Sequence, residues 1–479
     1  MLLGIGMFLF WYLLYPHALS YQEQYQLFLW TGDYFVERIG LPGGFADWLG
    51  ECFVQFYYIE WLGALLLSSL YVALQRLAAR LLPESWWWLS IVPVAFLWWL
   101  MGDVNVLLSL LVAIVLALTI ACARLSKPLT WVDVIIVPIG YWLIGPVMWL
   151  YVMIRACQIG WGHLWSAGWL LAVQLMAYAW LLPQWPLQQV MTGLNYYRIP
   201  LHYPQLSGYD KETYELIRMD YLVRNERWDE IVKRAGNYQV RTAFWCNCVN
   251  LALSQKRLLA DRMFDFYQSG SDALIMPRTR DLTSMLPSAE AFWHLGMVNS
   301  ALRYMFDTQE SILNGRKSGR CTKRIAECMI INGHYQTASK HLDLLKKTLF
   351  YRSWAKEMEA MMKDETQINK HSVYGCLRQF RYKENFLYNY EEIDKMMGLL
   401  FMNNTGNKMA LDYFLAQMLL KGDIRNFQQY LGLAQQYGGY RQMPLGYQDV
   451  MRCIQMQGRV SDSPYAKYVQ RMTERSSQP

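Results

Sequence analysis

Three carboxylates in the first quarter of the chain have surroundings that suit a general base: Glu23, Asp33 and Asp103. Glu23 and Asp33 lie in a polar stretch between two long apolar segments, and Asp103 lies in a short connection between two later ones. A carboxylate beside a membrane surface tends to have a raised pKa and can accept a proton or bind a cation. If the protein is an enzyme, we expect these residues to be catalytic. The competing interpretation is that they only solvate helices at the membrane surface.

Other catalytic signatures are missing from the sequence. There is no glycine-rich phosphate loop, no His-Glu-x-x-His motif and no Cys-x-x-Cys pair. The seven His are scattered, so we expect no metal site and no cofactor. No motif indicates nucleic-acid binding. The Cys residues lack the spacing of a disulfide framework, and we interpret them as free thiols packed as small apolar side chains.

The elements that must position the carboxylates fall into an apolar part and a polar part. Up to about residue 190 the net charge is −3, and beyond it the net charge is +10, which gives the overall +7. A bilayer core requires about 20 apolar residues per helix. Six segments approach or meet that length: residues 2–16, 57–75, 86–101, 104–122, 131–154 and 164–182. Buried helices of a soluble protein are the alternative, but the charges are confined to the connections.

We therefore predict an all-α fold that begins with a transmembrane helix bundle of about six spans, residues 1–183, in contact with membrane lipid. Residues 17–56 between the first two spans predict an amphipathic outer loop with two surface helices that are split at a Pro-Gly-Gly turn. The fifth segment is interrupted at four positions, which is typical of a broken or re-entrant helix. These positions are Pro138, Gly140, Gly145 and Pro146.

Basic residues in the short connections predict the orientation of the bundle. Arg76 and Arg80 follow the second span, and Arg124 and Lys127 follow the fourth, whereas the first loop is acidic. This alternation places the amino terminus and the basic connections in the cytoplasm of a bacterial inner membrane. Arg155 does not fit strict alternation. For the second half of the chain we expect a cytoplasmic location, with the periplasm as the alternative.

The second half is predicted to consist of paired short helices. Residues 184–209 predict a linker, and residues 210–470 predict a helical-repeat domain. In five pairs, a small or polar turn is followed by a bulky residue that opens the second helix: Trp228, Leu258, Val298, Tyr335 and Ile424. Their spacing resembles the tetratricopeptide class of repeats, which has a period of about 34 residues and implies an α-solenoid. A non-repetitive all-α domain is the alternative.

The densest basic cluster of the chain lies within this predicted domain. It consists of Arg316, Lys317, Arg320, Lys323 and Arg324. Such a cluster indicates either a solvated helix face or a surface for an anionic partner or lipid headgroups.

The first loop, with its paired surface helices and early acidic residue, resembles that of polytopic glycosyltransferases that use lipid-linked sugars. In that family such a residue is the catalytic base, which the resemblance assigns to Glu23 or Asp33. Taken whole, the spans and the tetratricopeptide-like half resemble an uncharacterised family of bacterial membrane proteins. We expect a membrane protein that displays a helical-repeat scaffold for a protein or peptide partner. The alternative is a glycosyltransferase-like enzyme with its site in the first outer loop.

Overall fold

The computed structural model describes most of the chain, and the residues that it describes are all-helical apart from an isolated antiparallel bridge between Val106 and Tyr197. They are residues 2–125, 130–198, 208–238, 240–277, 282–312, 316–383, 390–437, 439–456 and 462–476. Residues 199–207 of the predicted linker lie outside this set.

The chain forms two compact units. Unit 1 comprises Met1–Tyr214, Ile312–Arg320 and Leu344–Ser353. Unit 2 comprises Glu215–Ser311, Cys321–Asp343 and Trp354–Pro479. Two short segments of the predicted helical-repeat half therefore belong to the same unit as the predicted membrane bundle.

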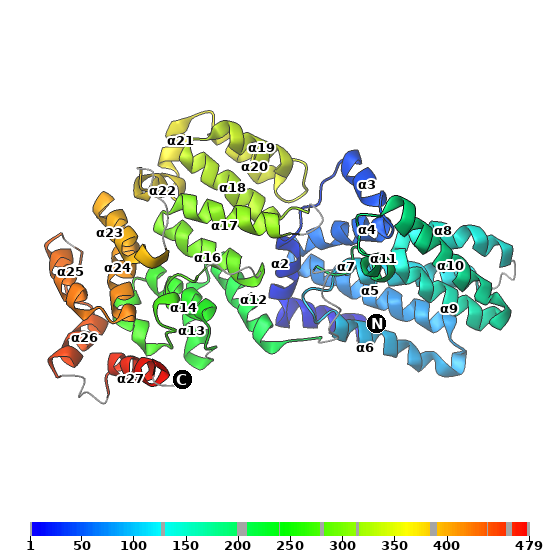
Figure 1. Ribbon diagram of the computed structural model, residues 1–479, viewed down its shortest axis with the longest axis horizontal. Coiled ribbons are helices and arrows are strands. Elements are labelled where there is room, and N and C mark those ends of the chain that lie inside the picture. The colour runs from blue at the N-terminus through cyan, green and yellow to red at the C-terminus, as the bar shows by residue number, and fades with distance from the viewer. Residues whose placement is uncertain are drawn as a thin grey trace. The chain divides into compact units, whose positions relative to one another are not determined.

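Unit 1 is built from short and medium helices, shown in blue and cyan to green in Figure 1. They are α1 (Leu2–Leu9), α2 (Pro16–Gln24), α3 (Gly32–Ile39), α4 (Gly44–Val54), α5 (Glu60–Leu81), α6 (Ile91–Leu100), α7 (Leu108–Ala123), α8 (Asp133–Ile144), α9 (Met148–Ile159), α10 (Trp165–Met176) and α11 (Leu187–Thr192). Short π- or 3-10 segments extend several of them, among them Phe10–Leu14, Glu84–Ser90 and Ala177–Leu181.

Three stretches of unit 1 are long and apolar enough to cross a membrane: Glu60–Leu81, Asp133–Ile159 and Gly162–Leu181. A fourth candidate is the pair Leu2–Leu14 and Pro16–Gln24, which is bent by 76°. The apolar helix Leu108–Ala123 is shorter. The membrane character of the first half is thus supported, whereas the count of six spans rests on the sequence pattern.

The stretch Asp133–Ile159 is not a straight rod, because α8 and α9 fold back on each other. The hydroxyl of Tyr151 in α9 donates to the carboxylate of Asp133, the first residue of α8, at 2.6 Å. The guanidinium of Arg155 lies 3.5 Å from the same carboxylate. In a continuous helix, residues 133 and 155 would be about 33 Å apart. The reversal occurs at Gly145, whose φ of 63° and ψ of −150° suit glycine.

One end of this hairpin is held by a buried charged group, which we call the arginine end. It consists of Arg124 after α7, Asp133, Arg155 and His163 just before α10. The Asp133 carboxylate lies 3.7 Å from Arg124 and 3.2 Å from His163. The cation at the end of α7 and the anion at the start of α8 are favourable partners of the helix dipoles. Four chain segments are therefore tied together at this end.

The opposite end of the bundle, which we call the loop end, lies beside the first loop. The backbone N–H of Gly43 donates to Trp142 at 2.8 Å, and the N–H of Leu107 donates to Tyr196 at 2.9 Å. The hydroxyl of Tyr196 donates to the carbonyl of Ile144 at the hairpin tip. The tip of the hairpin thus lies near the start of α7, and its open end lies near the end of α7. Figure 1 shows α8, α9 and α10 side by side.

The first loop contains the two helices expected on either side of the Pro-Gly-Gly turn, α3 and α4, and Gly43 has the left-handed φ of 80°. Helix α4, however, packs against α7 and α8 and buries much of its surface. Close approach to α7 is possible because position 50 is glycine: a Cβ there would lie 2.9 Å from the backbone of Ser109. Helix α4 is therefore part of the bundle and does not lie on its surface.

Unit 2 consists of paired helices, shown from green to red in Figure 1. They are α12 (Lys211–Arg224, which begins in unit 1), α13 (Trp228–Asn237), α14 (Ala243–Gln255), α15 (Leu259–Arg262), α16 (Leu282–Leu295), α17 (Val298–Ser311), α18 (Gly319–Asn332), α19 (Tyr335–Leu345), α20 (Arg352–Met361), α21 (Glu365–Lys370), α22 (Tyr374–Phe380), α23 (Ile393–Asn403), α24 (Lys408–Lys421), α25 (Ile424–Gln436), α26 (Leu445–Gln455) and α27 (Pro464–Ser476). The first two residues of α18, the last two of α19 and the first two of α20 belong to unit 1.

The five predicted turns between paired helices share one backbone geometry. Helices begin at Trp228, Val298, Tyr335 and Ile424 as predicted, and at Leu259, one residue after the predicted Leu258. Two positions before each start, a residue has a left-handed φ of 53° to 82°: Glu226, Arg257, Gly296, Gly333 and Gly422. The next backbone N–H donates to the carbonyl five residues earlier at 2.8–2.9 Å. These are Schellman turns, and Glu226 and Arg257 adopt the glycine conformation despite their side chains.

Candidate functional site

The three predicted carboxylates occupy separate places in unit 1. Glu23 is buried in the last turn of α2, Asp33 is exposed in the first turn of α3, and Asp103 is half-buried in the turn after α6. Asp103 accepts a hydrogen bond from the backbone N–H of Asn105 at 2.9 Å. No hydrogen bond or ion pair described in the structure joins any two of the three carboxylates. The structure does not bring them together as one site.

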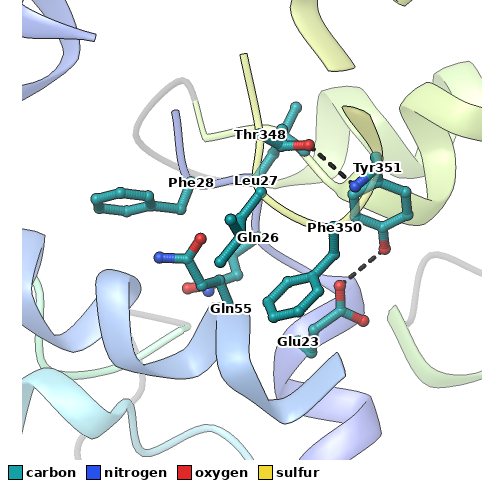
Figure 2. Close-up of a pocket in the computed structure, with 9 residues that line it drawn as sticks. Glu23, Gln26, Leu27, Phe28, Gln55, Thr348, Phe350 and Tyr351 are labelled. Carbon is teal, nitrogen blue, oxygen red and sulfur yellow. Dashed lines mark hydrogen bonds between the residues drawn. The ribbon is translucent and has the colours of Figure 1, made fainter. Parts of the chain in front are cut away.

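Glu23 is engaged by a residue far away in sequence. The hydroxyl of Tyr351 donates to its Oε1 at 2.7 Å, as Figure 2 shows. The two residues line a small hollow with Gln26, Gln55 and Phe350 among its other walls. The hollow has room for about one water molecule, whereas pockets for small-molecule ligands usually measure about 300–1,000 Å³. The hollow is therefore smaller than a usual ligand pocket.

A second group of ionisable side chains, which sequence analysis did not single out, lies in α3 and α4. Asp47 and Glu51 are four residues apart and share one buried face of α4. Tyr34 and Arg38 have the same spacing on α3. Arg316 from the segment Ile312–Arg320 of unit 1 completes the group. We call these five residues the carboxylate–arginine cluster.

The cluster is a chain of charge-assisted hydrogen bonds. Nη2 of Arg316 donates to both oxygens of Asp47, at 2.7 and 2.8 Å, and its Nε lies 3.6 Å from Glu51. Nε of Arg38 donates to Glu51 at 3.0 Å, and the hydroxyl of Tyr34 donates to the same oxygen. Two carboxylates thus face two guanidinium groups, and the formal charges balance inside the fold.

Burial dominates the electrostatics of the cluster. It raises the pKa of Asp47 to about 6, and the charge of Glu51 adds to the rise, although Arg316 opposes it. Burial and the charge of Glu51 also raise the pKa of Tyr34 well above its usual value. Burial alone would lower the pKa of Arg316, but Asp47 and Glu51 raise it. Both guanidinium groups therefore remain charged and hold the carboxylates.

The irregular stretch after α2 is clamped by the two late segments of unit 1. On one side, the N–H of Gly319 donates to Gln26 at 3.0 Å. On the other, the N–H of Trp30 donates to Lys347 at 2.9 Å. Arg320 also donates to the side chain of Gln24 at 2.8 Å. The first loop is therefore a docking surface for residues that follow it by about 300 positions.

The predicted basic cluster is largely satisfied within the chain. Arg316 and Arg320 bond to Asp47 and Gln24, as described above. Arg324 pairs with Glu290 and Glu327 of unit 2, at 2.8 Å each. Lys317 remains exposed. The cluster is neither a simple solvated face nor an open anion-binding surface.

Nothing in the described part of unit 1 forms a metal-binding arrangement of three or more His, Cys, Asp or Glu side chains, and the same search of the described residues of unit 2 finds none. All nine Cys residues are free. The arrangement of the first loop can hold two chain segments together, and it can change its strength with the protonation of Asp47.

The fold and this cluster define an all-helical protein with candidate membrane-spanning helices and an internally paired first loop. Comparison of the sequence with family models identifies the family. Residues 1–477 match a family of unknown function, DUF6057, and the chain belongs to this family. No curated protein matches the chain, and no solved structure matches it.

Proposed function

We propose that this is a multi-pass membrane protein whose bundle displays a helical-repeat scaffold for a protein or peptide partner. The observation that carries the proposal is the pairing of the first-loop carboxylates. Glu23, Asp47 and Glu51 all contact Tyr351 or Arg316, which come from the segments of unit 1 that flank α18 and α19. A role in anchoring chain segments accounts for these buried carboxylates without a catalytic function.

The shared turn geometry supports the repeat part of the proposal. Five helix pairs with the same Schellman turn are what a stack of related units requires, because each pair must bury its apolar face on a neighbour. Helix α25 leaves Tyr430, Leu433 and Tyr437 partly exposed on one face. A peptide partner could bind to such an aromatic surface.

The membrane part of the proposal follows from the exposed tryptophans. Trp86, Trp87, Trp88 and Trp131 near the arginine end are all more than half exposed, as is Trp180 near the loop end. Exposed indoles at both ends of an apolar bundle are typical of the two membrane interfaces. We propose that α1, α5, α6, α7, the α8–α9 hairpin and α10 pass through the bilayer.

The hairpin favours a periplasmic location for the helical half. With α8 and α9 antiparallel, Arg155 lies at the same end as Arg124, so all the basic connections share the cytoplasmic side. The last apolar helix then ends at the loop end. The segments Ile312–Arg320 and Leu344–Ser353 pack at that same end, so the chain between them is on the side of the first loop. Buried Cys side chains are compatible with an oxidising compartment because oxidants do not reach them.

Labelling with a membrane-impermeant thiol reagent tests this topology. In a variant without its native Cys residues, Glu37→Cys in the first loop and Lys363→Cys in the helical half should both be labelled from the periplasm of intact cells. Both positions are exposed. Protection of Lys363→Cys, together with labelling of Glu37→Cys, would contradict the periplasmic location.

Photo-crosslinking from α25 tests the scaffold. A photoreactive residue at Leu433 should give discrete protein adducts in intact cells, and the same residue at the lipid-facing Trp131 should not. Glu23→Gln and Asp33→Asn should leave these adducts and the abundance of the protein unchanged. If either amide abolishes the function of the protein at normal abundance, the transferase alternative replaces the scaffold.

A further inference from the structure

Arg198, just after the isolated bridge, is a positively charged residue with an unusual environment. Its backbone N–H donates to Asn105 at 2.7 Å, which fixes the residue at the loop end of the bundle. Its guanidinium lies over the rings of Tyr21 and Tyr25, with its carbon 5.2 and 4.7 Å from their centres. Both rings are buried in or next to the last turn of α2. The side chain is therefore held between a connecting segment and α2.

The guanidinium has few partners for its hydrogens. An arginine side chain has five N–H donors. Nη2 donates to Oε1 of Gln22 at 3.0 Å, and no other hydrogen bond joins the guanidinium to a described residue. Nε is buried without a partner. Gln22 itself is oriented by the bond from its Nε2 to Val104 at 2.9 Å, so its oxygen faces Arg198.

The positive charge of Arg198 also has no counter-charge in the described part of unit 1. None of the carboxylates there forms an ion pair with it, and the segment that follows, residues 199–207, contains no Asp or Glu. Burial lowers the pKa of Arg198, and the positive charge of Arg316 acts in the same direction, whereas Tyr21 and Tyr25 oppose it. A half-buried guanidinium that keeps its charge in such surroundings is stabilised by an anion.

We propose that Arg198, packed against the adjacent rings of Tyr21 and Tyr25, binds a phosphate group at the loop end of the bundle. The forked donors of a guanidinium match phosphate oxygens, and contact with the two aromatic rings restricts the movement of the side chain. Helix α2 follows the first apolar helix after a bend of 76°. In the membrane arrangement proposed above, this bend lies at the outer end of the first span, at the level of the lipid headgroups. The phosphate comes either from an anionic lipid headgroup or from a soluble phosphate or diphosphate.

Binding to the full-length protein in a phosphate-free glycoside detergent tests the proposal. One arm adds phosphatidylglycerol and counts retained lipid by native mass spectrometry. The other adds inorganic diphosphate and measures its affinity by calorimetry. Arg198→Gln should lower the affinity of the ligand that binds by about 10- to 100-fold, since hydrogen bonds to charged groups are lost. Arg80→Gln, an exposed position in the last turn of α5 at the opposite end of the bundle, is the matched control and should change it less than twofold.

The arms separate the sources of the phosphate. Retention of lipid without diphosphate binding identifies a headgroup site, and diphosphate binding identifies a site for a soluble ligand. If Arg198→Gln does not fold, Arg198→Lys keeps the charge without the fork and should still lower affinity by about tenfold. The proposal is wrong if neither ligand binds, if a folded Arg198 variant binds within twofold of the native protein, or if Arg80→Gln lowers binding equally.

Discussion

Removal of the Arg316 guanidinium is expected to destabilise the protein in a pH-dependent way. Arg316→Gln leaves Asp47, which is only 1% exposed, without its principal counter-charge. Removing one partner of a buried pair typically costs about 3–5 kcal/mol. The glutamine amide can still donate one hydrogen bond, so we expect a loss of about 3 kcal/mol at pH 8.

The pH dependence follows from the pKa of Asp47. In the folded native protein it is raised to about 6, above its ordinary value. The stabilising contribution of Asp47 is therefore complete below about pH 4 and is lost as the pH rises through 6. Arg316 opposes this rise, so the pKa of Asp47 should be still higher in the variant. The loss of stability with rising pH should therefore continue to a higher pH in the variant than in the native protein. Below pH 5, protonated Asp47 needs no counter-charge, and the difference should shrink to about 1 kcal/mol.

Thermal unfolding of the full-length protein in detergent at pH 5 to 8 measures the effect. A loss of about 3 kcal/mol corresponds to a decrease in Tm of about 6–12 °C. Ser318→Ala in the same segment is the matched control, because it removes a neutral hydrogen bond to the carbonyl of Gln24 and should give a small decrease that is the same at every pH. A deficit of Arg316→Gln that does not grow between pH 5 and pH 8 would refute the role of Asp47.

Three further outcomes are expected. Tyr351→Phe should lower the free energy of unfolding by about 1–2 kcal/mol in chemical denaturation, because it removes the hydrogen bond to Glu23. Glu23→Gln, whose amide oxygen can still accept that bond, and exposed Asp33→Asn should each change it by less than about 0.5 kcal/mol. Glu226→Gly and Arg257→Gly should each raise the unfolding free energy by about 1 kcal/mol, because glycine adopts their left-handed φ without strain; a decrease would contradict this. Native Cys157, which is exposed next to Arg155, should react with a membrane-impermeant thiol reagent only after the cytoplasmic face is opened, and labelling from the periplasm would exclude the hairpin topology.

The features that sequence analysis predicted well are those set by neighbouring residues. The helices at Trp228, Val298, Tyr335 and Ile424 begin where a small or polar turn is followed by a bulky side chain, because that pattern itself specifies the turn. The break in the fifth apolar segment was likewise visible in its Pro and Gly residues. Its outcome, a complete reversal, depends on the bonds of Asp133 to α9, and these do not follow from a local pattern.

The carboxylate–arginine cluster could not be predicted in the same way. Asp47 and Arg316 are 269 positions apart, and each belongs to a local pattern with an ordinary explanation. In the sequence, Asp47 is one of several acidic residues of the first loop, and Arg316 is the first residue of a basic cluster that is most simply interpreted as a solvated face. A sign of the pairing was present, since a basic cluster at the start of a helix is disfavoured unless acids elsewhere balance it.

The return of residues 312–320 and 344–353 to unit 1 has a consequence for the biogenesis of the protein. At about 5–20 residues per second, a ribosome adds Arg316 about 15–50 s after Asp47. During that interval the apolar helices can enter the bilayer, but α4 carries two carboxylates whose only positively charged partner in the cluster is Arg38. The buried face of α4 is then short of one positive charge, so it cannot settle against α7 without a penalty. Unit 1 therefore matures only after Ser353 has been synthesised, and a chain truncated before that point should be a substrate for membrane proteases.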